Sequence, residues 1–122
     1  MCVDDMKRSR RAVIAWAKEN LKGKKIFEPS TGKWVSFTSK GIKEAANQPH
    51  RHYREKNEAI RTITELFCSS EYVGSSLDDT REMYLYRYYK TTIAEEDSFI
   101  VIRENRYTGL VEFYTIVDKI KE

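Results

Sequence analysis

The stretch "SFIVIRENRYTGLVEFYTIVD", Ser98 to Asp118, decides the fold, because its hydrophobic residues recur at every second position on both sides of a turn. "SFIVIREN" and "LVEFYTIVD" therefore predict two strands, and "NRYTG" predicts the hairpin turn between them, with Gly109 near its end. The same period continues backwards through "EMYLYRYYKTTI" and the shorter "EYVGS". Residues 71–118 are therefore expected to form an antiparallel sheet of four strands.

The N-terminal third of the chain has a different pattern. Apolar residues at helical spacing predict a helix over 5–21, and Gly23 follows it as a C-cap. "KIFE" and "KWVSF", joined by "PSTGK", predict a small hairpin over 25–37, because proline and glycine favour a tight turn.

A helical segment over 39–69 connects this hairpin to the sheet. It is expected to hold a short helix, N-capped by Ser39, and a longer helix from Tyr53 to Cys68. Helices thus precede strands along one domain spanning 1–122. The predicted fold class is α+β, with N-terminal helices packed on an antiparallel four-stranded sheet and an additional small N-terminal hairpin.

The two faces of this sheet follow from the alternation of side chains along each strand. The core face is expected to include Val111, Phe113 and Val117. Tyr114 belongs to the other face, and Thr115 points away from Tyr114 unless a twist or bulge intervenes. The stretch "MYLYRYY" likewise places a row of three tyrosines on one face, namely Tyr84, Tyr86 and Tyr88. Such a row more often serves cross-strand packing than base stacking.

The composition is that of an ordinary globular protein. The 122 residues are 40% hydrophobic and 34% charged, and the net charge of +3 is too small to establish nucleic-acid binding by itself. The basic runs "KRSRR" and "KGKK" are typical of solvated surface. Two separate cysteines and no apolar leader or long apolar run predict a reduced, cytoplasmic protein without membrane contact.

The stretch "NQPHRHYREKNEAI" gathers five basic or titratable side chains where the longer helix begins, namely His50, Arg51, His52, Arg54 and Lys56. Cations at a helix N-terminus oppose the helix dipole, whereas a bound phosphate there would resolve the conflict. The simpler interpretation is a solvated surface on which Glu55 and Glu58 neutralise the cations. Charge spacing alone favours that simpler interpretation.

Histidines beside arginines also match the needs of RNA cleavage without a metal, in which a base and an acid move protons and cations hold the phosphate. Arg103 and Tyr114, in adjacent predicted strands, are further candidates because both can bond a phosphate. A lone HxH lacks a third metal ligand of evident spacing, and no nucleotide-binding or hydrolase motif occurs. No metal and no cofactor are therefore expected.

Three stretches carry a resemblance to a known family: "SKGIKEAANQPHRHYREKNEAI", "EYVGSS" and "SFIVIRENRYTGLVEFYTI". Together they resemble a large polyvalent protein-associated domain, which occurs in proteins of phages and conjugative elements. Such domains are similar to the phage-borne branch of the barnase, EndoU, colicin and RelE type nuclease fold. The resemblance implies metal-independent RNA cleavage, with His50 and His52 on the helix side and Arg103 and Tyr114 on the strands. Many phage-type members carry a histidine where this chain has Glu44.

The leading hypothesis is therefore a metal-independent endoribonuclease-like domain that cleaves RNA by transphosphorylation. Its catalytic residues would be His50, His52 and Tyr114, and its phosphate-binding residues Lys56, Arg51, Arg54 and Arg103. The alternative is a non-catalytic nucleic-acid- or protein-binding module of a mobile-element protein, and a third possibility is a toxin. The expected partners are RNA and an immunity protein or the parent mobile-element protein.

Overall fold

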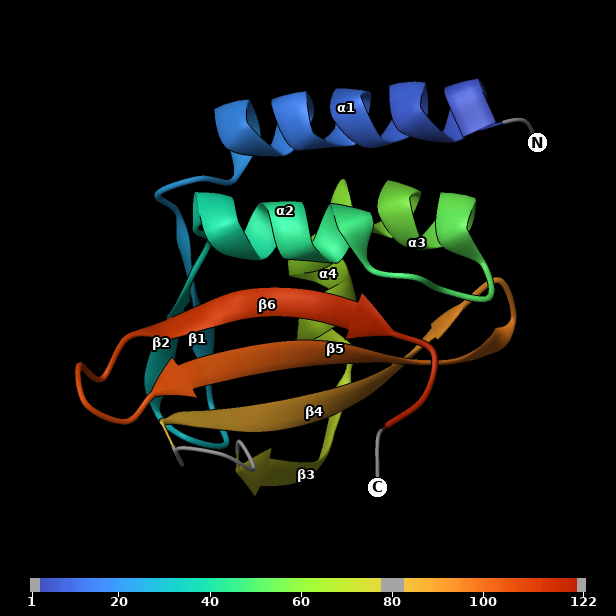
Figure 1. The fold of residues 1–122 in the computed structure, drawn as a ribbon. Helices are drawn as coiled ribbons and strands as arrows, with labels where there is room; N and C mark the ends of the chain where they lie inside the picture. The colour runs from blue at the N-terminus through green and yellow to red at the C-terminus, as the bar shows by residue number, and fades with distance from the viewer. Residues whose placement is uncertain (1–2, 78–82, 121–122) are drawn as a thin grey trace.

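The computed structural model describes residues 3–77 and 83–120. Four helices accompany a curled sheet whose strands run beneath α1 and α2 in Figure 1. The elements are, in chain order, α1 (Val3–Asn20), β1 (Lys25–Glu28), β2 (Lys33–Ser36), α2 (Ser39–Asn47), α3 (Tyr53–Ile60), α4 (Ile63–Cys68), β3 (Glu71–Leu77), β4 (Tyr84–Ile93), β5 (Glu96–Asn105) and β6 (Val111–Val117).

The sheet has six strands, in the order β1-β2-β6-β5-β4-β3, so the predicted four-stranded antiparallel sheet is wrong. Strands β3 to β6 do pair antiparallel, each with the next along the chain. The N-terminal hairpin is not separate, however, because β2 pairs with β6 in parallel at Ser36 and Glu112. An uncovered β6 would be an edge strand with unpaired backbone groups, and the hairpin supplies a partner. The sheet is therefore mixed.

Helix α2 covers the part of β6 that the hairpin leaves open. Its N-cap is Thr38 rather than the predicted Ser39, and the Thr38 hydroxyl accepts the N–H of Gly41 at 3.1 Å. Gly41 lies so close to β6 that a Cβ there would stand 1.9 Å from the carbonyl oxygen of Phe113. Only glycine allows this approach of helix to strand.

The predicted long helix from Tyr53 to Cys68 is also wrong, because it is broken at Arg61 and Thr62 into α3 and α4. The N–H groups of these two residues bond the carbonyls of Glu58 and Ala59, three residues back, which tightens the backbone there. The break turns α4 so that Ile63 and Phe67 continue the buried stripe that contains Ile60.

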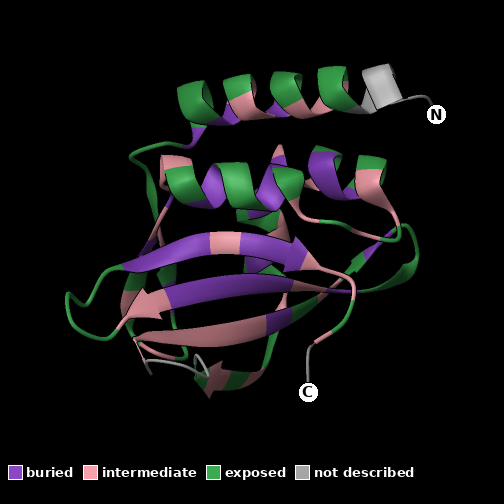
Figure 2. Cartoon of the chain, viewed as in Figure 1, coloured by how far each residue is buried: buried purple, intermediate pink, exposed green. Residues whose placement is uncertain are grey.

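A β-bulge in β6 decides which side chains reach the core. Val111 and Phe113 are buried in the core as predicted, but Val117 is only partly buried and Ile116 is fully buried instead. Val101 pairs with Thr115 and Ile102 with Phe113, which leaves Tyr114 as the extra residue. The extra residue reverses the alternation of faces beyond it, so the prediction for Val117 is wrong. In Figure 2, β5 and β6 are mostly coloured as buried and β4 mostly as intermediate.

Candidate functional site

His50 ties the loop between α2 and α3 to the sheet. Its Nδ1 accepts the backbone N–H of His52 at 2.8 Å, and its Nε2 lies 2.9 Å from the hydroxyl of Ser98 on β5. The Ser98 hydroxyl donates its own proton to the carbonyl of Val117, so Nε2 must be the donor in the contact with His50. Both ring nitrogens are thus engaged in a neutral imidazole. Burial lowers the pKa of His50, and the charge of Lys56 acts in the same direction, against that of Asp118.

The neighbouring Arg51 and His52 face carboxylates. The Arg51 guanidinium lies 2.6 Å from Glu96, at the start of β5, and its backbone N–H donates to Asp118 at 2.8 Å. The Nε2 of His52 lies 3.3 Å from the same Glu96 carboxylate. The bonds from Arg51 and then His52 hold the pKa of Glu96 below its ordinary value. Arg54, on α3, is exposed to solvent.

Lys56 is completely buried and therefore lies away from any surface at which a phosphate could bind. Its ammonium donates to the carbonyl of Ala45 at 2.5 Å, contacts that of Ala46 at 3.4 Å, and lies 4.4 Å from the centre of the Tyr53 ring. The two carbonyls belong to the last turns of α2, where the negative end of the helix dipole stabilises a cation. Burial lowers the pKa of Lys56 to about 7. Its position indicates a role in holding α2 and α3 together.

Arg103 lies on the face of the sheet that points away from α3 and α4. Its guanidinium carbon is 4.2 Å from the ring centre of Tyr84 and 4.3 Å from that of Tyr114, so the cation is stacked between two aromatic rings. Its Nη2 lies 3.2 Å from the carboxylate of Glu112 on β6, and both side chains are buried. Ring stacking and the ion pair together fix the guanidinium plane.

The stack continues into an aromatic surface, here called the tyrosine face: Tyr84, Tyr86, Tyr88, Arg103 and Tyr114. The ring centres of Tyr86 and Tyr114 are 5.7 Å apart and those of Tyr84 and Tyr86 are 6.3 Å apart. All four rings are partly exposed. The predicted alternation in β4 is confirmed, because the intervening Tyr89 packs on Phe67 among the helices.

A pocket of about 210 Å³ opens beside the tyrosine face, lined by Gln48, Tyr86, Tyr88, Val101, Tyr114, Thr115, Val117 and Lys119. Tyr114 and Thr115 both line it because the bulge turns neighbouring residues of β6 toward the same side. Burial raises the pKa of Tyr114, and the charge of Glu44 on α2 adds to this effect.

The predicted site residues therefore fall into separate places. Ser98, the residue that contacts His50, is five positions from Arg103 on β5. Five positions span about 16 Å along a strand, and because the number is odd the two side chains point to opposite faces. A recess of about 650 Å³ around His50 shares Gln48, Val117 and Lys119 with the pocket beside the tyrosine face. His50 lines only the recess and Tyr114 only the pocket beside the tyrosine face, so the two hollows are neighbours that do not share these two residues, whereas Lys56 lies inside the core.

A protein-family model, the large polyvalent protein-associated domain 3, matches residues 4–110. The chain belongs to the large polyvalent protein-associated domain 3 family. No curated protein and no solved structure shows a significant match. The relationship of this polyvalent-protein domain to the nuclease fold stays a prediction.

Sequence reasoning missed three contributors to the surface of this polyvalent-protein domain: Gln48, Glu112 and Lys119. The alternation of side chains along β6 places Glu112 on the same face as Tyr114, so the position of Glu112 could have been predicted from the sequence. Gln48 and Lys119 reach the pocket only through the path of the chain beyond α2 and β6, which local periodicity does not encode. Among residues 3–77 and 83–120, no three metal-ligating side chains cluster and no helix has the length and apolarity of a membrane span.

Proposed function

We propose that this polyvalent-protein domain is a non-catalytic module that binds single-stranded RNA on its tyrosine face. The observation that carries the proposal is the stacking of the Arg103 guanidinium between Tyr84 and Tyr114 at the edge of an open aromatic surface. Proteins that bind single strands combine aromatic side chains, on which bases stack, with cations that follow the phosphates. The exposed Lys119 at the rim of the adjoining pocket supplies such a cation.

The arrangement on this face is rigid before any ligand arrives. Glu112 and two rings hold Arg103, and the Thr38 hydroxyl donates to the Glu112 carboxylate at 3.1 Å. A surface that is already ordered loses little conformational entropy on binding. The pocket of about 210 Å³ is smaller than the sites that enclose drug-sized ligands, which suits one unstacked base.

The predicted ribonuclease has less support, because the groups that its mechanism needs are engaged elsewhere. A general base requires a free lone pair, and the Nδ1 of His50 already accepts the N–H of His52. The His52 ring faces Glu96, and the Lys56 ammonium is enclosed at the end of α2. Binding without cleavage is therefore the function that this geometry favours.

Binding and cleavage can be measured in one sample, with a labelled single-stranded RNA in EDTA followed by anisotropy and by gel electrophoresis. We expect intact RNA and an affinity that falls about 5- to 150-fold in Tyr114→Leu, since stacking contributes about 1–3 kcal/mol per base. Tyr107→Leu is the matched control, because Tyr107 is 77% exposed in the turn between β5 and β6, away from the lining of the pocket. RNA products that disappear in His50→Ala would favour the ribonuclease instead, and absence of RNA binding would reject the proposal.

A further inference from the structure

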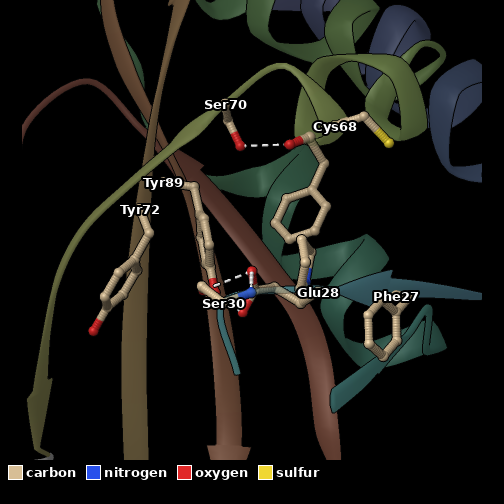
Figure 3. Close-up of a pocket in the computed structure, with 9 residues that line it drawn as sticks. Phe27, Glu28, Ser30, Cys68, Ser70, Tyr72 and Tyr89 are labelled. Carbon is tan, nitrogen blue, oxygen red and sulfur yellow. Dashed lines mark hydrogen bonds between the residues drawn. The ribbon is translucent and has the colours of Figure 1, made fainter. Parts of the chain in front are cut away.

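A second pocket, of about 380 Å³, lies on the helix side of the sheet, between the β1–β2 hairpin, α4 and the strands β3 and β4. Its walls include the rings of Phe27, Phe67, Tyr72 and Tyr89. Figure 3 shows the carboxylate of Glu28 near the Tyr89 hydroxyl, with the Tyr72 ring on the other side of Tyr89. None of these residues lines the pocket beside the tyrosine face.

Glu28 places a negative charge inside this pocket. The residue is 4% exposed, and its carboxylate accepts the backbone N–H groups of Ser30 and Thr31 and the Ser30 hydroxyl. Burial acts to raise the pKa of Glu28, but these bonds outweigh it and the pKa is lowered, so the group is ionised at neutral pH. Among the ion pairs of residues 3–77 and 83–120, none involves Glu28. The charge is hydrogen-bonded by its own turn but not neutralised.

Tyr89 places a hydroxyl beside that charge. The residue is 3% exposed, and its hydroxyl lies beside the Glu28 carboxylate, whose charge adds to burial in raising the pKa of Tyr89. Its ring is fixed by Phe67 at 4.9 Å and Tyr72 at 5.4 Å between ring centres. The raised pKa keeps this hydroxyl protonated at neutral pH, and its oxygen has lone pairs with which it can accept a hydrogen bond from a ligand.

We propose that this pocket binds a cation, a guanidinium or ammonium group on a short apolar stem, such as an arginine or lysine side chain or a free alkyl amine. The Tyr89 oxygen accepts a hydrogen bond from the cation, Glu28 attracts its charge, and the exposed rings of Phe27 and Tyr72 lie against its stem. Aromatic faces favour cations of this kind, and the low dielectric around a buried carboxylate strengthens the attraction.

The test is an NMR titration of the ¹⁵N-labelled domain with N-acetyl-arginine amide, which carries a guanidinium, and with N-acetyl-citrulline amide, its neutral isostere. Agmatine carries the same guanidinium without the peptide groups, so a shift with agmatine shows that the pocket recognises the guanidinium itself. We expect saturable shifts of the Ser30, Ser70 and Tyr72 amides with both guanidinium probes and none with citrulline amide. Equal shifts with citrulline amide, or no saturable shift with any probe, would overturn the proposal.

Two variants make the assignment specific. Glu28→Gln keeps an acceptor for the turn and Tyr89→Phe keeps the ring, and each is expected to weaken guanidinium binding about fivefold or more. Unchanged affinity in both variants, with native spectra, would rule out this pocket as the site. RNA affinity should be the same in Glu28→Gln and the unaltered protein, so this proposal and that of the tyrosine face succeed or fail independently.

Discussion

Two side chains that look like a phosphate site in the sequence turn out to connect elements of the fold. His50 fastens the loop after α2 to Ser98, and Lys56 fastens the last turn of α2 to α3. Both are titratable groups in unusual surroundings, and Lys56 is buried while His50 is partly buried. How far each is buried depends on how α2 and α3 pack, which the spacing of charges does not reveal.

Burial of Lys56 should make stability rise with pH. Its pKa is about 7 in the folded protein, against the ordinary 10.5, so the unfolded chain binds the additional proton between these values. The free energy of unfolding is therefore expected to increase from pH 7 to pH 9, with an upper limit of about 1.4 kcal/mol per pH unit. Urea unfolding of the unaltered protein and of Lys56→Met measures this, and the increase should be absent in the variant. Parallel profiles for the two proteins would contradict it.

His50 should lose its stabilising role in acid. Because burial lowers its pKa below 6.5, the neutral ring contributes stability that is complete above pH 6.5 and is lost as pH falls through the folded pKa. NMR titration of the ring protons is expected to place this pKa below 6.5. Unfolding experiments should show a smaller loss between pH 7 and 5 in His50→Gln than in the unaltered protein, and an equal loss would count against the assignment.

Among the elements, turns and strands were predictable and irregularities were not. Glycines mark the end of α1 and the β5–β6 turn, and Gly23 and Gly109 both adopt positive φ there, at 87° and 80°. The break at Thr62 and the bulge at Tyr114 have no local signature, because each is selected by the packing of residues beyond it. The bulge matters most, since it brings Tyr114 and Thr115 to one pocket.

The contact between α2 and β6 gives a prediction at this scale. In Gly41→Ala the new Cβ would stand 1.9 Å from the Phe113 carbonyl, so α2 must move away from the strand. We expect a loss of at least about 3 kcal/mol in the free energy of unfolding. Gly109→Ala is the matched control, because its Cβ meets nothing within 4 Å and only the positive φ costs energy, about 1–2 kcal/mol. Equal losses in the two variants would contradict the close packing of α2 on β6.

For the whole molecule, the class of fold followed from the sequence but the sheet did not. The attachment of the hairpin to β6 rests on the pairing of Ser36 with Glu112, residues far apart in the chain, and no periodicity specifies it. The adjacency of Arg103 and Tyr114 was predicted from neighbouring strands and is confirmed. Their separation from His50 and Lys56 could not be predicted, because it depends on which face of the sheet the helices cover.

The balance of charge over the molecule predicts a shallow dependence of RNA binding on salt. Arg103 on the tyrosine face is paired with Glu112. Lys90, on the same strand as three of the tyrosines, has its ammonium 3.6 Å from Asp97. Lys119 is therefore the main cation at the rim of the pocket. The slope of log K against log salt should be about −1 to −2, and Lys119→Ala should reduce its magnitude by about 0.7. Anisotropy titrations at several salt concentrations measure this, and a slope unaffected by Lys119→Ala would place the phosphates elsewhere.

The central claim, that RNA lies on the tyrosine face, is tested most directly by mapping where RNA changes the NMR spectrum of the ¹⁵N-labelled domain. The expected result is a set of saturable amide shifts in β4, β5 and β6 around Tyr86, Arg103 and Thr115, with the Tyr107 turn and the Glu28 pocket unchanged. Shifts confined to the basic residues of α1, or an unchanged spectrum at saturating RNA, would contradict it.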